Sequence, residues 1–162
     1  MTPPTLEDVT AKFEEIYQGT ATTPGLCETE TLIPTIATLK SLASLAPIAI
    51  VTGRPVSDCQ KFMTQHSLTS ALSHPPCVCM EHGPAKPDPF PVSRACELLK
   101  VEACASVIMI GDTPDDIRAA VSAGCTGVGV ATPDEYRRAA GEGKGPAETR
   151  LGKVRREVRD CV

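Results

Sequence analysis

The strongest constraint on the fold of this chain is a short apolar run that ends abruptly in acidic residues. Residues 107–110 read Val-Ile-Met-Ile, Gly111 follows, and three carboxylates come soon after, at Asp112, Asp115 and Asp116. Four apolar residues closed by a glycine are typical of a buried strand, and the residues that follow favour a helix. The pattern therefore predicts a strand, a tight turn and the start of a helix, with carboxylates at the carboxyl end of the strand.

The spacing of these carboxylates indicates a metal site. Open α/β sheets bind their ligands at the carboxyl ends of parallel strands, and carboxylate oxygens are ligands suited to Mg²⁺. Asp112 would leave the end of the strand, while Asp116 would reach back from the first helical turn. We therefore expect Asp112 and Asp116 to face one magnesium ion.

Elsewhere in the chain, apolar patterning predicts alternating helices and strands. An amphipathic helix is expected from Leu6 to about Gly19, where Ile16 is the last apolar residue of the face. Further helices are expected over about 34–45, 55–65, 91–100 and 114–123, and strands over 48–51, 77–80, 107–110 and 124–131. Strands that alternate with helices call for a parallel sheet with helices on both faces.

Two further strand-to-helix connections contain residues suited to anions. Thr52 and Gly53 follow the strand at residues 48–51, so a hydroxyl and nearby backbone N–H groups would lie at a second strand end. Lys86 lies in a loop stiffened by Pro87 and Pro89, which would hold its ammonium group in a defined direction. The simpler interpretation is that Thr52 begins the next helix and that Lys86 is solvated. Together with the acidic turn, however, these residues are typical of a phosphoryl-transfer site.

Composition argues against several classes of protein. Aromatic residues make up 3% of the chain and Trp is absent, so stacking platforms for nucleic acid are not expected. No apolar run approaches the roughly 20 residues that span a bilayer, and acidic residues near the start argue against a signal peptide. The eight cysteines, several of them inside apolar segments, are expected to be reduced core residues of a cytoplasmic protein.

Charge is unevenly distributed along the chain. Residues 1–135 contain 8 Lys or Arg against 16 Asp or Glu, whereas residues 136–162 contain 8 against 4. The Gly-rich residues 141–146 are expected to be a flexible linker, followed by a basic, exposed tail. A basic tail on an acidic body without interleaved aromatic residues does not favour nucleic-acid binding.

Three segments of the chain resemble motifs of the haloacid dehalogenase superfamily, in particular its phosphoglycolate-phosphatase-like branch with a small helical cap. Ile-Val-Thr52-Gly-Arg is similar to the second motif of that family, Lys86-Pro-Asp-Pro to the third, and Ile-Gly-Asp112-Thr-Pro-Asp-Asp116 to the fourth. The resemblance covers about residues 30–132. It implies a Rossmann-like core and Mg²⁺-dependent hydrolysis of a small phosphorylated metabolite.

The resemblance also implies a role for each matched residue. Thr52 and Gly53 would bind phosphate, Lys86 would steady the phosphate, and Asp112 with Asp116 would hold Mg²⁺. By the same resemblance, residues 1–19 would be a remnant of the cap, residues 20–140 the core domain, and residues 141–162 the linker and tail.

The first motif of the family, Asp-x-Asp at the end of a central strand, occurs nowhere in this chain. That motif supplies the nucleophile that forms an aspartyl phosphate. We therefore expect weak Mg²⁺ binding and no phosphatase turnover from this chain alone. The missing strand would leave a gap, a rearranged sheet, or a place that a protein partner fills to complete the sheet.

Three functions remain open at this point. The first is a phosphatase-type hydrolase by lineage, represented by an incomplete chain. The second is a non-catalytic phosphate-binding, Mg²⁺-binding or scaffold protein. The third is a zinc-binding module built on four residues, His74, Cys77, Cys79 and His82, because alternate residues of a strand face the same side.

Overall fold

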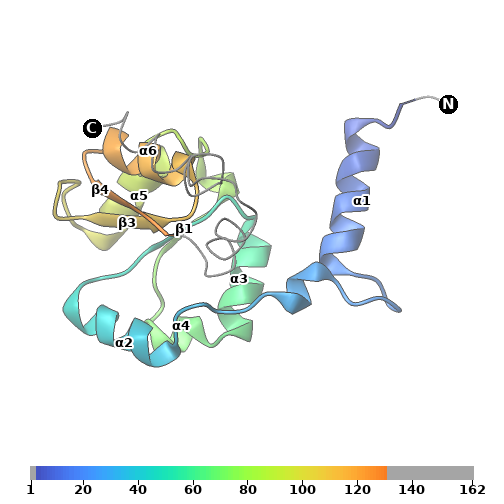
Figure 1. Cartoon of the computed structure of the whole chain (residues 1–162), viewed down its shortest axis with the longest axis horizontal. Helices are drawn as coiled ribbons and strands as arrows, with labels where there is room; N and C mark the ends of the chain where they lie inside the picture. Colours follow the sequence, from blue (N-terminus) through green and yellow to red (C-terminus); the bar gives the residue numbers. More distant parts are fainter. Residues whose placement is uncertain (1–2, 131–162) are drawn as a thin grey trace, which may run out of the picture. The chain divides into compact units, whose positions relative to one another are not determined.

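The structure of the chain is a computed structural model that describes residues 3–130 (Figure 1). Internal contacts divide the chain into two compact units, Met1–Thr38 and Leu39–Val162. The linker and basic tail expected over residues 141–162 lie outside the described residues. The division into a cap remnant and a core domain stays a prediction. Between residues 3 and 130, no helix is both long enough and apolar enough to cross a membrane.

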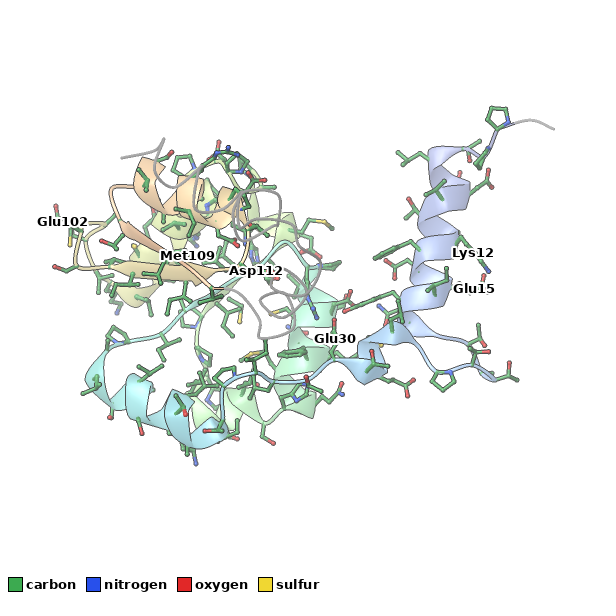
Figure 2. The ribbon with its side chains drawn as sticks, in the orientation of Figure 1. Lys12, Glu15, Glu30, Glu102, Met109 and Asp112 are labelled. Carbon is green, nitrogen blue, oxygen red and sulfur yellow. The ribbon has the colours of Figure 1, made fainter. Side chains whose placement is uncertain are left out.

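The first unit contains helix α1 (Leu6–Gln18) and a 3-10 helix, η1 (Leu26–Thr29). A reciprocal capping box between Thr5 and Asp8 begins α1, and Gly19, with φ of +82°, ends it as the sequence predicts. Figure 2 labels Lys12 and Glu15, whose side chains form an exposed ion pair of 2.8 Å on this helix. The aliphatic side chains of α1 and its Phe13 ring are exposed.

The predicted alternation of helices and strands is observed in the rest of the described chain. Helix α2 (Ile36–Leu45) lies across the boundary between the units. The elements that follow it are β1 (Ile50–Val51), α3 (Val56–Gln65), α4 (Leu68–Ala71), β2 (Cys77–Val78), η2 (Met80–His82), α5 (Phe90–Leu99), β3 (Ile108–Gly111), α6 (Pro114–Ser122) and β4 (Thr126–Gly129). The strands are shorter than predicted, and α4 and η2 were not predicted.

The described strands form two separate parallel pairs. In one pair, Ile50 of β1 lies beside Cys77 of β2. In the other, Ile108 of β3 lies beside Thr126 of β4, and the pairing continues to Gly111 and Gly129. Each pair is a two-stranded sheet, so β1 and β3 each have an edge that no described strand covers. This arrangement confirms the α/β class with parallel strands, and among the described residues the sheet is divided.

Helices α5 and α6 provide the core of the second unit. Helix α6 lies against β3 and β4 (Figure 1), while α5 contacts α6, β1 and β2, so the two helices together connect the strand pairs. The buried cluster contains Val92 and Cys96 of α5, Ala119 and Ala120 of α6, and Cys125. Small side chains allow the helices to approach the sheet closely, which suits a chain poor in aromatic residues.

Candidate functional site

The turn between β3 and α6 is fixed by a capping box that uses one of the predicted site residues. Thr113 is the N-cap of α6, and its hydroxyl accepts a hydrogen bond of 3.2 Å from the backbone N–H of Asp116. In return, Asp116 Oδ2 accepts hydrogen bonds from the backbone N–H of Thr113 at 3.0 Å and from its hydroxyl at 2.7 Å. The interaction that begins the helix therefore also fixes the orientation of the Asp116 carboxylate.

The other oxygen of this carboxylate contacts the predicted phosphate-binding lysine. Lys86 Nζ donates to Asp116 Oδ1 at 2.5 Å, and the two side chains are 19% and 4% exposed. Asp116 is the buried charged residue of the described chain. Buried charges are stable in proteins when they are paired and hydrogen-bonded, as this one is at both oxygens. The structure thus brings together Lys86, from the loop before α5, and Asp116, from the first turn of α6.

Opposing effects act on the pKa of Asp116. Burial raises the pKa of the carboxyl group, but hydrogen bonds from Lys86 and Thr113, together with the positive charge of Lys86, outweigh it, and the net pKa lies below the ordinary value of 3.8. Asp116 is therefore ionised at neutral pH, as a cation-binding carboxylate must be.

Gly111 is required for this arrangement because Asp116 lies directly against its backbone. A Cβ atom at residue 111 would lie 2.4 Å from the Cβ, Cγ and Oδ2 atoms of Asp116. No real Cβ makes such a contact, so a side chain here would push the carboxylate away from Lys86. Gly111, which ends the apolar run, therefore leaves the space that the Asp116 carboxylate occupies.

Asp112 has a different environment from Asp116. It comes directly after the last residue of β3 and is exposed (Figure 2). Carboxylate oxygens are ligands suited to Mg²⁺, and Asp116 Oδ1 retains acceptor capacity because it has two lone pairs and accepts one hydrogen bond, from Lys86. The donor set therefore fits Mg²⁺. That Asp112 and Asp116 bind one ion stays a prediction.

The predicted phosphate loop follows β1. The backbone N–H of Thr52 donates to Val78 O at 2.9 Å, which extends the pairing with β2 by one residue. The Thr52 hydroxyl accepts a hydrogen bond of 3.2 Å from the N–H of Arg54, while Gly53 is exposed. That Thr52 and Gly53 share a site with Lys86 and Asp116 stays a prediction.

Contacts that the sequence did not predict fix this loop. Both carboxylate oxygens of Glu81 accept the backbone N–H of Val56, the first residue of α3, at 3.0 Å. The N–H of Met80 donates to Arg54 O at 3.0 Å, and the Arg54 guanidinium lies 5.4 Å from the centre of the Phe62 ring. Glu81 is 25 residues from Val56, and no local pattern pointed to this contact.

The zinc hypothesis is not supported by the described residues. Within residues 3–130, no group of three or more His, Cys, Asp or Glu side chains is arranged to bind a metal ion. His82 Nδ1 accepts the backbone N–H of Cys79 at 2.8 Å. Burial, followed by the neighbouring Cys59, raises the pKa of Cys77 to about 11 and that of Cys79 to about 12.

Comparison with known proteins identifies the family. The model of the haloacid dehalogenase-like hydrolases matches residues 3–124. The chain belongs to this family, whose members generally use Mg²⁺. The family resemblance inferred from Thr52, Lys86, Asp112 and Asp116 is thereby confirmed.

Individual relatives cover the chain to different extents. Over 157 residues the chain is 45% identical to an imidazoleglycerol-phosphate dehydratase of Phytophthora nicotianae. The matched region covers 96% of this chain and 33% of that protein. The chain thus spans about one third of the length of that relative. It is 29% identical to the structure of a predicted phosphoglycolate phosphatase from Haemophilus somnus, with a TM-score of 0.51 over 57% of this chain and 41% of the other.

A third comparison bears on the fold alone. The structure of the D,D-heptose 1,7-bisphosphate phosphatase from B. bronchiseptica, complexed with magnesium and phosphate, covers 90% of this chain and 93% of that chain. Its TM-score is 0.55 and its sequence identity 16%. This likeness supports the α/β architecture.

Proposed function

We propose that this chain forms the phosphate- and magnesium-binding part of a phosphatase that hydrolyses a small phosphomonoester. The observation that best supports this function is the buried ion pair between Lys86 and Asp116 beside the carboxyl end of β3. A lysine from a loop and an aspartate from the first turn of a helix, fixed at a strand end, suit a site that binds a phosphate group and its counterion.

In this proposal each residue has a separate role. The Thr52 hydroxyl and the backbone at Gly53 bind phosphate oxygens, and the ammonium group of Lys86 offsets the phosphate charge. Asp112 and Asp116 bind Mg²⁺, which would supply Lewis-acid polarisation of a phosphoryl oxygen when bound. Asp116 also holds Lys86 in place through Oδ1.

The names of the relatives support a small phosphorylated metabolite as the substrate class. One relative is named a phosphoglycolate phosphatase, and the other an imidazoleglycerol-phosphate dehydratase, so the second name agrees with a phosphorylated substrate but names a different reaction. Phosphoglycolate and imidazoleglycerol phosphate are both small phosphate esters of low molecular weight. The seven cysteines found free between residues 3 and 130 suit a reducing compartment, and we propose a cytoplasmic location.

We also propose that these 162 residues do not turn over substrate alone. They contain no Asp-x-Asp, so the covalent route through an aspartyl phosphate has no nucleophile here. Binding of phosphate and Mg²⁺ needs only the residues already named, and we expect it to be weak without the missing carboxylates.

The test is an assay of the purified chain with Mg²⁺ and an aryl phosphate. We expect no sustained release of phosphate above the rate of the Asp112→Ala variant. Turnover that depends on Mg²⁺ and disappears in that variant would show that the chain is a phosphatase by itself. Because both samples come from the same preparation procedure, a contaminating phosphatase would appear equally in each.

A non-catalytic binding function remains the second candidate, because the Lys86–Asp116 pair is intact without a nucleophile. Isothermal titration with MgCl2 and with inorganic phosphate tests the binding site that both candidates require. Binding without turnover supports the binding protein as well as the incomplete enzyme. Loss of both binding signals would remove both functions.

A further inference from the structure

Three of the described cysteines gather where the end of β2 meets the start of α3, and we call them the thiol cluster. Cys77 lies in β2 and Cys79 follows in extended conformation, so their side chains are on the same side of the chain. Cys59 lies one turn into α3. Cys59 and Cys79 are buried, at 6% and 5% exposure, whereas Cys77 is half-buried. The cluster therefore combines one partly accessible thiol with two buried ones.

Hydrogen bonds fix the segment after β2 beside the start of α3. The N–H of Met80 donates to Arg54 O at 3.0 Å. Both carboxylate oxygens of Glu81 accept the N–H of Val56 at 3.0 Å. Cys59 comes three residues after Val56, and residues three apart share one face of a helix. Cys59 is therefore on the side of α3 that faces the end of β2.

Cys59 is the thiol that both other thiols approach. Its side chain is within hydrogen-bonding reach of the Cys77 thiol and of the Cys79 thiol. A disulfide needs a sulfur–sulfur bond of about 2.05 Å, and sulfur atoms that are already neighbours can approach further by rotation of their side chains. Between residues 3 and 130 no such group is arranged to bind a metal ion, so chemistry between two thiols at a time is the chemistry open to this cluster.

The partly accessible thiol allows exchange with a small disulfide such as oxidised glutathione. The Cys77 thiolate would attack one sulfur of that disulfide, which forms a mixed disulfide and releases one small thiol. The Cys59 thiolate would then attack the Cys77 sulfur, which forms the internal bond and releases the second small thiol. Two protein thiols are oxidised, the small disulfide is reduced, and the two cysteine protons end on the released thiols.

Protonation of the thiols controls how fast such a bond forms and how long it lasts. Burial, followed by the neighbouring Cys59, raises the pKa of Cys77 to about 11. Because the thiolate is the nucleophile, exchange is slow at neutral pH and becomes faster as pH rises. A low thiol pKa stabilises the reduced form of a dithiol, so a raised pKa has the opposite effect and favours the disulfide once it has formed.

We propose that Cys59 and Cys77 form a reversible disulfide bond when the chain meets a small disulfide, while Cys79 stays reduced. The bond would close a loop over residues 59–77 and join α3 directly to β2. A reversible bond is compatible with a reducing compartment, where protein disulfides are usually transient. The inference is independent of the proposed phosphatase function, because it uses no residue of the proposed phosphate and Mg²⁺ site.

Mapping of disulfides in the full chain tests the inference directly. The folded chain is incubated with oxidised glutathione at about pH 8.5, where exchange is faster, and free thiols are then blocked. Mass spectrometry of unreduced peptides, with fragmentation between Cys77 and Cys79, identifies the linked pairs. We expect the Cys59–Cys77 bond to be about five times more abundant than any other internal pair, because folding gives these thiols a high effective concentration. Dithiothreitol should remove it.

The same mapping in urea provides the control for folding. The preference for Cys59–Cys77 should disappear there, because it depends on the folded arrangement of α3 and β2. Absence of this bond from the folded chain, an equal yield in urea, or a bond from Cys59 to Cys79 in its place would each show that the inference is wrong.

Two matched variants provide a second measurement. Cys59→Ser removes the thiol that resolves the mixed disulfide, whereas Cys104→Ser removes an exposed thiol outside the cluster. We expect glutathione to remain on Cys77 in Cys59→Ser, and the internal bond to form in Cys104→Ser as in the unmodified chain. Oxidation should also raise the urea midpoint of the unmodified chain and of Cys104→Ser, because a cross-link restricts the unfolded state. An unchanged or lower midpoint in the oxidised unmodified chain would contradict a folded arrangement that accommodates the bond.

Discussion

Replacing Lys86 and Asp116 separately and together would measure how strongly the site is tied to the stability of the fold. Lys86→Met removes the ammonium group but keeps an aliphatic chain of similar length. Asp116→Asn removes the charge and keeps an oxygen acceptor for Thr113. Together with the double variant, these changes form a double-mutant cycle that isolates the interaction between the two side chains.

The structure sets the size of the expected effect. The Asp116 side chain is 4% exposed and that of Lys86 is 19% exposed, so solvent screens the ion pair only in part. Hydrogen bonds to charged groups contribute about 1.5–3 kcal/mol, and a buried charge that loses its partner costs about 3–5 kcal/mol. Because Lys86 is partly exposed, we expect each single variant to lose about 2–3 kcal/mol and the coupling energy to be about 2 kcal/mol.

An exposed ion pair in the same chain provides the control. Arg94 and Glu97 on α5 approach to 2.8 Å, a distance similar to that of the buried pair, but their side chains are 46% and 65% exposed. Exposed pairs of this kind contribute about 0.3–0.5 kcal/mol. The cycle of Arg94→Met and Glu97→Gln should therefore give a coupling energy several times smaller.

Urea unfolding followed by circular dichroism at 222 nm measures all of these free energies, because the chain is rich in helix and contains no tryptophan. The m-value must stay constant across the variants for the comparison to hold. A coupling energy for Lys86 and Asp116 no larger than that of Arg94 and Glu97 would refute the argument that burial makes this pair strong.

Three further outcomes follow from the same site. Gly111→Ala should lower the free energy of unfolding by about 1–3 kcal/mol, because its Cβ would overlap Asp116. Gly53→Ala is the control and should leave this free energy unchanged, because its Cβ meets no atom within 4 Å. Urea unfolding measures the free energy of both variants. Because the pKa of Asp116 is lowered in the folded chain, its contribution to stability is present above the ordinary pKa of 3.8 and is lost as pH falls through the folded pKa. Asp116→Asn should flatten this acid dependence in unfolding curves measured at successive pH values. Thr52→Val should abolish phosphate binding in calorimetry while Thr52→Ser preserves it, and equal binding by both variants would remove Thr52 from the proposed site.

Local patterns predicted the elements of the fold well. Gly19 and Thr113 are recognisable helix boundaries, and apolar runs that end in glycine or in Thr-Gly marked the ends of β3 and β1. These features depend on neighbouring residues, which a sequence shows directly. The helix α4 (Leu68–Ala71) was missed because a single turn has too few residues for a periodic pattern.

Contacts between distant segments were less accessible to prediction. The sequence placed Lys86 and Asp116 in separate strand-to-helix connections, but only the structure shows that they form an ion pair and that Thr113 donates to the second carboxylate oxygen. Likewise, the sequence did not reveal that Glu81 holds the first turn of α3. Such contacts depend on the packing of whole elements, which periodicity alone does not determine.

The capping box at Thr113 has a consequence for how the site comes into being. The Asp116 carboxylate, which completes the first turn of α6, also accepts a hydrogen bond from the ammonium group of Lys86 in a separate loop. Fraying of that turn would therefore release the lysine, and docking of the lysine would in turn discourage fraying. Formation of the first turn of α6 and placement of Lys86 for binding an anion are thus coupled in one equilibrium.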